Sequence, residues 1–180
     1  MTLNRKSLQL LEGALFDHNE GWDGYHEIHL RLQREKAIEG KDDFVDIIDW
    51  KSPRNKTRAQ QVRWNGRLVQ LTEEAFKRAD RGQLEVAIEK LDEIPQVAPR
   101  TASAILMFYN PEKFTVMDKF AFKALDNGLG MKPGFGYKTA KDYPQYNAMC
   151  LKVATDFGRN LRDTDRALWF MGKHKTWKAE

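Results

Sequence analysis

The stretch LDEIPQVAPRTASAILMFYNPEKFTVMDKFAFK, residues 91–123, decides how the rest of the chain is interpreted. It follows apolar residues that recur at helical spacing from Gln83 to Leu91, which predicts a helix there. A short turn between Pro95 and Pro99 comes next, because a residue before proline leaves the helical region and proline suits the first turn of a new helix. The pattern therefore predicts a helix, a tight turn and a second helix.

The second helix of this stretch is expected over Arg100–Tyr109. Nearly every position in it is apolar, which is typical of a helix buried on all sides. A break at Asn110-Pro111 ends it, and Asp118 then stands at the start of a further helix. Two helices joined by so few residues form a helical hairpin.

A resemblance to the helix-hairpin-helix superfamily of base-excision DNA glycosylases rests on three runs, IPQVAPRTASAIL, NPEKF and VMD, within about residues 84–125. The resemblance implies an all-α fold of two helical subdomains, with a helix-hairpin-helix motif and a cleft between them. It also implies that the hairpin turn holds a phosphate of double-stranded DNA through backbone N–H groups. An aspartate then lies at the entrance of a base-binding pocket.

Two residues carry the catalytic part of the resemblance. Asp118 matches the catalytic aspartate, and Arg100 falls where part of the superfamily has a lysine that attacks the sugar; they are 118 − 100 = 18 residues apart. Arginine stays protonated and is a poor amine nucleophile. We therefore expect a monofunctional glycosylase unless another lysine substitutes, for which Lys51 and Lys119 are the candidates.

The turn departs from the superfamily pattern at both of its glycines. Gln96 and Ala98 stand in their places. Glycine suits such a turn because it adopts positive φ and allows a phosphate to approach the backbone closely. A side chain forced into the left-handed region costs about 1–2 kcal/mol. Either the turn differs or its hold on DNA is weaker.

The charge distribution is compatible with a DNA partner. The formal net charge is +4, and residues 51–67 contain six basic residues and no acidic one. Residues 131–180 hold ten basic and five acidic residues, a net charge of +5. Such regions can follow a phosphate backbone, although they can equally be solvated faces. The predicted DNA contacts are Gln96, Val97, Ala98, Arg100, Thr101, Lys51, Arg54 and Lys119.

The run WKSPR, residues 50–54, combines an indole with two cations. That combination can stack on an extruded base or bind phosphates, and it is similar to runs in small members of the same superfamily. The alternative is that Trp50 closes the core while the two cations extend to solvent. Aromatic residues that could line a base pocket are Trp22, Tyr25, Trp50, Phe135 and Tyr137, and the sequence does not rank them.

The chemistry that suits Asp118 is cleavage of an N-glycosidic bond. Positive charge develops on the sugar as the base leaves, and a carboxylate can stabilise it and orient water. Asp118 also fits the N-cap of the following helix, and both roles are compatible. Two other functions stay open: a helix-hairpin-helix protein that binds DNA without catalysis, and a helical protein-interaction domain.

The chain reads as one domain, residues 1–180, with residues 40–127 as a central helical part and residues 1–39 plus 128–180 as a second part. We expect Asp42 to cap one helix, and a helix of residues 57–70 to be followed by another that Thr72 caps. Gly40 should end the helix of residues 25–38, and Asp163 should cap the last helix. Residues 128–142 hold four glycines and read as a long loop.

The composition sets limits on cofactors and location. A single cysteine, Cys150, leaves no four-cysteine zinc site or iron–sulfur cluster, and His26 and His29 have no second pair of ligands, so we expect neither metal nor cofactor. No apolar run approaches the roughly 20 residues of a membrane span, and no signal-peptide pattern is present. We expect a cytoplasmic, nucleoid-associated monomer.

Overall fold

The computed structural model describes residues 2–17 and 24–178, and in these ranges the fold is all-α with no strand, as the sequence predicts. The α-helices are α1 (Arg5–Asp17), α2 (Gly24–Glu35), α3 (Lys41–Lys51), α4 (Lys56–Gln61), α5 (Gly66–Asp80), α6 (Leu84–Asp92), α7 (Pro99–Tyr109), α8 (Lys119–Lys123), α9 (Asp142–Phe157) and α10 (Leu161–His174). Short helical turns are η1 (Pro53–Asn55), η2 (Ala124–Gly128) and η3 (Thr176–Lys178).

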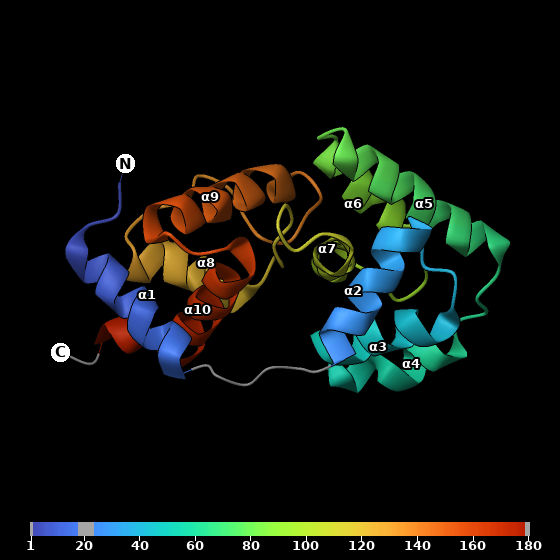
Figure 1. The fold of residues 1–180 in the computed structure, drawn as a ribbon, viewed down its shortest axis with the longest axis horizontal. Coiled ribbons are helices and arrows are strands. Elements are labelled where there is room, and N and C mark those ends of the chain that lie inside the picture. The colour runs from blue at the N-terminus through green and yellow to red at the C-terminus, as the bar shows by residue number, and fades with distance from the viewer. Residues whose placement is uncertain (1, 18–23, 179–180) are drawn as a thin grey trace.

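The helices gather in two groups on either side of α7 (Figure 1). On one side α10 packs against α1, α8 and α9, and on the other α2 and α3 pack against α7 while α5 packs against α6. Contacts between α6 and α9 connect the two groups. The assignment of residues 40–127 and of residues 1–39 plus 128–180 to two subdomains stays a prediction.

Helix α7 is the most deeply buried element. Every residue from Ala102 to Tyr109 is buried, as the unbroken apolar pattern predicts. Pro99 occupies its first turn, where a missing N–H removes no helical hydrogen bond. At the other end Tyr109 stacks on Phe76 of α5 with ring centroids 4.1 Å apart. The helix therefore forms the centre of the group that contains α2, α3, α5 and α6.

Four of the predicted helix boundaries are wrong, for different reasons. Thr72 does not cap a helix: it lies inside α5, and its hydroxyl accepts from the N–H of Ile38 and donates to the carbonyl of Val69. The break comes earlier instead, at residues 62–65. The cap of α5 is Asn65, whose side chain accepts from the N–H groups of Arg67 and Leu68.

The other three corrections concern α3, α10 and α2. Helix α3 has Gly40 at its N-cap, so Asp42 lies in the first turn, where its charge favours the helix dipole. Helix α10 is capped by Asn160, which accepts from the N–H of Asp163. In addition α2 ends at Glu35, before Gly40, with Lys36 at a φ of 57°.

Helix α8 and helix α10 approach each other through Gly172. A Cβ atom at this position would lie 1.8 Å from the carbonyl oxygen of Phe120, so only glycine fits. Phe120 and Trp169 add an edge-to-face ring contact across the same interface. The position of α8, and of the residue that caps it, is therefore set by α10.

The segment between η2 and α9 is a loop, as its glycines predict. Asp142 organises its end by accepting from the N–H groups of Gly136, Lys138 and Thr139. Burial alone would raise the pKa of the Asp142 carboxyl, but these three bonds and the Thr139 hydroxyl together outweigh it and lower the pKa. Within the described residues, no helix is both long and apolar enough to cross a membrane.

Candidate functional site

Asp118 lies at the N-terminus of α8 and caps it. Its backbone is extended, with φ −135° and ψ 145°, and its Oδ1 atom accepts from the N–H of Phe120 at 2.8 Å. The predicted capping role is thus confirmed. One carboxylate oxygen is used in this way, which leaves Oδ2 to meet other groups.

The Oδ2 atom of Asp118 accepts from the Nζ atom of Lys51 at 2.9 Å. Lys51 is the last residue of α3, so the ion pair joins the two helix groups. The Asp118 side chain is 16% exposed and that of Lys51 is 13% exposed. Because both charges are largely removed from water, this contact is unlike the exposed pairs elsewhere on the surface.

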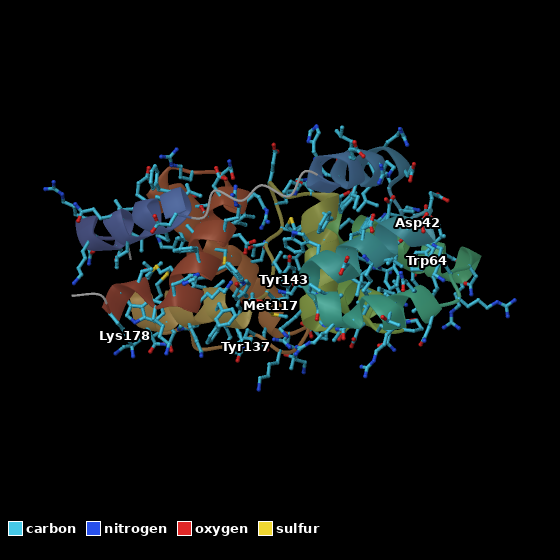
Figure 2. All side chains as sticks on the ribbon, turned by 90° about the horizontal axis from the view of Figure 1, so that it is seen from below. Asp42, Trp64, Met117, Tyr137, Tyr143 and Lys178 are labelled. Atoms are coloured by element: carbon cyan, nitrogen blue, oxygen red, sulfur yellow. The ribbon has the colours of Figure 1, made fainter. Side chains whose placement is uncertain are left out.

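The segment that leads into Asp118 is fixed by hydrogen bonds from α7 and α9. The N–H of Met117 donates to the Ser103 hydroxyl of α7 at 2.8 Å. From α9, Tyr143 and Tyr146 donate to the carbonyls of Thr115 and Val116. Figure 2 shows Met117 and Tyr143 between the two helix groups. The carboxylate is therefore held on a rigid base, as a reacting group requires.

Two charged residues of α10 lie near the ion pair, and the sequence reading missed both. Asp165 is buried, accepts from the Thr115 hydroxyl at 2.9 Å, and pairs with Arg162 at 2.6 Å. Burial raises the pKa of the Asp165 carboxyl, and Arg162 opposes the rise. No local signal marks an aspartate in an amphipathic helix as buried. Only the Arg-x-x-Asp spacing, one helical turn, suggests that the two residues pair.

The turn between α6 and α7 has a left-handed residue at one of the two glycine positions. Gln96 has a φ of 71°, whereas Ala98 is extended at φ −114° and ψ 166°. Glycine would therefore ease the backbone at Gln96 but not at Ala98. The side chain of Val97 is buried, and its N–H donates to the carbonyl of Ile94.

Three N–H groups at this turn are available to a ligand. In the described part of the chain, the N–H groups of Gln96, Ala98 and Arg100 donate no hydrogen bond. They lie at the N-terminus of α7, where the helix dipole favours an anion. The side chains of Gln96 and Arg100 are exposed, and that of Thr101 is half-buried. The Ser103 hydroxyl, which binds the N–H of Met117, also donates to the Arg100 carbonyl.

The other predicted contacts lie at the surface near Asp118 and Lys51. Arg54 is exposed in η1, three residues after the ion-paired lysine. Lys119 is exposed and its Nζ atom lies 4.7 Å from the ring centroid of Phe120. Of the two lysines that could replace the superfamily amine, Lys51 is the one that binds Asp118.

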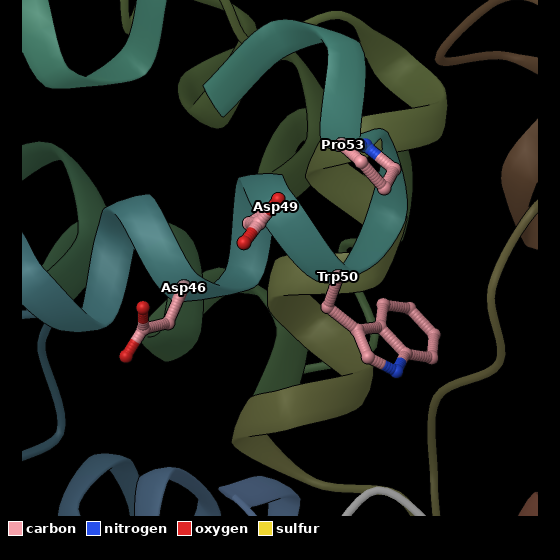
Figure 3. A pocket seen from close by; sticks show the side chains of 4 residues that line it. All are labelled: Asp46, Asp49, Trp50 and Pro53. Carbon is pink, nitrogen blue, oxygen red and sulfur yellow. The ribbon is translucent and has the colours of Figure 1, made fainter. Parts of the chain in front are cut away.

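Of the aromatic residues proposed for a base pocket, Trp50 lies next to the ion pair. It lines a hollow of about 440 Å³ together with Asp46, Asp49 and Pro53, and its indole projects away from the two carboxylates (Figure 3). Phe135 and Tyr137 pack instead against Phe122 of α8. Trp22 and the side chain of Tyr25 lie outside the described residues.

The histidines considered as metal ligands lie on α2. The Nδ1 atom of His29 is 3.0 Å from the carbonyl of Phe108, and His26 is exposed. Across residues 2–17 and 24–178, no group of three or more histidine, cysteine or acidic side chains is arranged to hold a metal ion.

Comparison of the chain with protein families, with curated proteins and with solved structures finds no match.

Proposed function

We propose that this protein binds double-stranded DNA and hydrolyses the N-glycosidic bond of an extruded, damaged or modified base, with Asp118 as the catalytic residue. The observation that carries the proposal is the placement of Asp118. Its carboxylate is rigidly held, pairs with Lys51, and follows a segment that is hydrogen-bonded to α7. The N-terminus of that same helix presents the N–H groups of Gln96, Ala98 and Arg100.

The DNA-binding part of the proposal uses the turn and the cations around it. The three N–H groups suit a phosphate oxygen, which accepts readily at a helix N-terminus. Exposed Arg100, Arg54 and Lys119 add positive charge that follows the backbone. Phosphate contacts of this kind position the duplex without reading its sequence. A base removed from the stack would then reach the neighbourhood of Trp50 and Asp118.

The catalytic part of the proposal follows from the charge that develops on the sugar. As the bond to the base breaks, the deoxyribose becomes cationic and the Asp118 carboxylate stabilises it electrostatically. The same carboxylate orients a water molecule that adds to the sugar. Lys51 fixes the direction of Oδ2, and the Phe120 N–H fixes that of Oδ1. Arg100 cannot act as the amine nucleophile, so a free abasic site is the expected product.

A second function is favoured by the same two bonds. Both oxygens of Asp118 already have protein partners, one in a helix cap and one in an ion pair that joins the helix groups. A purely structural aspartate would look the same. In that case the protein binds DNA through the α6–α7 turn and catalyses nothing.

The test is incubation with duplexes that contain uracil, 8-oxoguanine, 3-methyladenine or hypoxanthine, followed by hot alkali. Alkali-dependent nicks that disappear in Asp118→Asn support the proposed hydrolase. Salt-sensitive binding without product favours the DNA-binding alternative, and no binding contradicts both. Nicks without alkali, with borohydride trapping that Lys51→Gln abolishes and Lys119→Gln does not, would make Lys51 the attacking amine.

A further inference from the structure

Arg162 of α10 lies against the indole of Trp50 at the end of α3. Its Cζ atom is 5.2 Å from the ring centroid, within the range of a cation–π contact. The two residues belong to different helix groups (Figure 1) and are 162 − 50 = 112 positions apart in the chain. The Arg162 side chain is 24% exposed, so its contact with the indole is largely shielded from water.

Asp165 fixes the direction of this guanidinium. Its Oδ2 atom accepts from Arg162 at 2.6 Å, and its Oδ1 atom accepts from the Thr115 hydroxyl at 2.9 Å. The Asp165 side chain is 6% exposed. A carboxylate this deeply buried is costly unless it is fully bonded, which makes the arrangement of the two residues well defined. Thr115 also belongs to the segment that leads to Asp118, so one network serves both residues.

The indole of Trp50 is held from two directions. Phe108 of α7 meets it edge to face, with centroids 5.2 Å apart and an interplanar angle of 86°. Arg162 lies over the ring, and Trp50, which is half-buried, is one of the residues that line the hollow of Figure 3. A ring locked in this way loses little side-chain entropy when a base stacks on it. The next residue, Lys51, binds Asp118.

We propose that Arg162, anchored by Asp165, is a positioning residue that holds the Trp50 indole as the stacking surface for the extruded base. This inference rests on the proposed function, because it assigns a role to that same site. Stacking on an aromatic ring stabilises a base outside the duplex whatever its identity, because every base has a π-face. Loss of the support should weaken recognition of a base and leave the phosphate contacts at the α6–α7 turn intact.

The experiment compares two kinds of duplex, so that base stacking is separated from backbone binding. One carries a lesion base from the four-lesion panel, and the other carries tetrahydrofuran, an abasic analogue with no base to stack, at the same position. Affinities and base release are measured for the wild type, Trp50→Ala, Arg162→Gln and the double variant. Arg159→Gln, which removes one positive charge at an exposed residue, is the control.

We expect Arg162→Gln and Trp50→Ala each to lower kcat/KM on the lesion duplex about tenfold and to leave tetrahydrofuran binding unchanged. The double variant should be no worse than Trp50→Ala, since both changes remove the same surface. Asp165→Asn should also lower kcat/KM on the lesion duplex, as Arg162→Gln does. Cooperative thermal unfolding with midpoints well above the assay temperature verifies that Arg162→Gln and Arg159→Gln are folded, and the midpoint of Arg162→Gln should be the lower one because Asp165 loses its cation.

The results that overturn the inference are specific to it. One is an active wild type for which Arg162→Gln and Arg159→Gln have the same kcat/KM on the lesion duplex. Another is a double variant whose loss of kcat/KM is the sum of the losses of Arg162→Gln and Trp50→Ala. The third is an equal loss of affinity for the lesion duplex and the tetrahydrofuran duplex. Absence of base release by the wild type contradicts the proposed function itself. The two failures are therefore distinguishable.

Discussion

The ion pair between Lys51 and Asp118 joins the two helix groups at the candidate site. With side chains only 13% and 16% exposed, it lies between exposed pairs, worth about 0–1 kcal/mol, and buried ones, whose disruption costs about 3–5 kcal/mol. We expect Lys51→Met to lower the free energy of unfolding by about 1–3 kcal/mol, measured by urea denaturation. The control is Lys77→Met, which removes a lysine from a pair with Glu73 whose side chains are 58% and 43% exposed. It should change the free energy of unfolding by less than about 0.5 kcal/mol. Equal losses of unfolding free energy in Lys51→Met and Lys77→Met would show that the shielded pair is worth no more than an exposed one.

Gln96 allows a second residue-scale prediction. Its φ of 71° costs about 1–2 kcal/mol for a residue with a side chain, whereas glycine adopts it freely but loses about 0.5–1 kcal/mol through its larger unfolded-state entropy. Gln96→Gly should therefore stabilise the protein by about 0.5–1 kcal/mol. Ala98→Gly is the control, because Ala98 is extended and should only lose stability. Denaturant unfolding measures the sign of the change in unfolding free energy. Destabilisation by both variants would show that the backbone at Gln96 is not strained.

At the scale of elements, the contact between α8 and α10 controls the position of Asp118. A methyl group at Gly172 would collide with the Phe120 carbonyl, and the N–H of Phe120 binds Asp118. We expect Gly172→Ala to destabilise the protein by about 1–3 kcal/mol, as overpacking does, and to reduce any activity of Asp118. The check is a thermal melt together with the base-release assay.

Gly13→Ala provides the matched control for that change. Gly13 is an exposed position inside α1, and a Cβ atom there meets nothing within 4 Å. Alanine in a helix is favoured over glycine by about 0.5–1 kcal/mol, so this variant should be slightly more stable. If Gly172→Ala were equally harmless, the close approach of α8 and α10 would not hold α8 in place.

The sequence was sufficient for elements with strong local signals. Apolar periodicity and two prolines predict the α6–α7 helix pair. The Asp118 cap is predictable because its hydrogen bond joins residues only two positions apart in the sequence. The predicted cap at Thr72 is wrong because its hydroxyl accepts from the N–H of Ile38, a contact between residues 34 positions apart that no local pattern contains. The contact between Arg162 and Trp50 was not predicted for the same reason, since the two residues are far apart in the sequence.

At the scale of the whole molecule, Cys150 reports on opening of the fold. The thiol is buried in α9, and burial raises its pKa, which suppresses the reactive thiolate. Reaction with an excess of Ellman's reagent at neutral pH should be slow in the native protein and should become immediate in denaturant. Fast reaction of the native protein would mean that α9 opens locally.

The buried Asp165 makes the stability of the whole molecule depend on pH. Its pKa in the native state is raised by burial, above the value of 3.8 of an unperturbed carboxyl. Between these two values the native state binds more protons than the unfolded state, so the free energy of unfolding falls as pH rises through that window. Asparagine does not titrate, so Asp165→Asn should lack this fall.

Urea unfolding over a series of pH values measures the effect directly. The stability of the wild type relative to Asp165→Asn should be greatest at acidic pH and should decline as Asp165 ionises. Glu89→Gln, a change at an exposed residue of α6, should run parallel to the wild type across the series. A difference between wild type and Asp165→Asn that grows with pH would show that Arg162 and the Thr115 hydroxyl outweigh burial, and that the carboxylate stabilises the junction of the two helix groups.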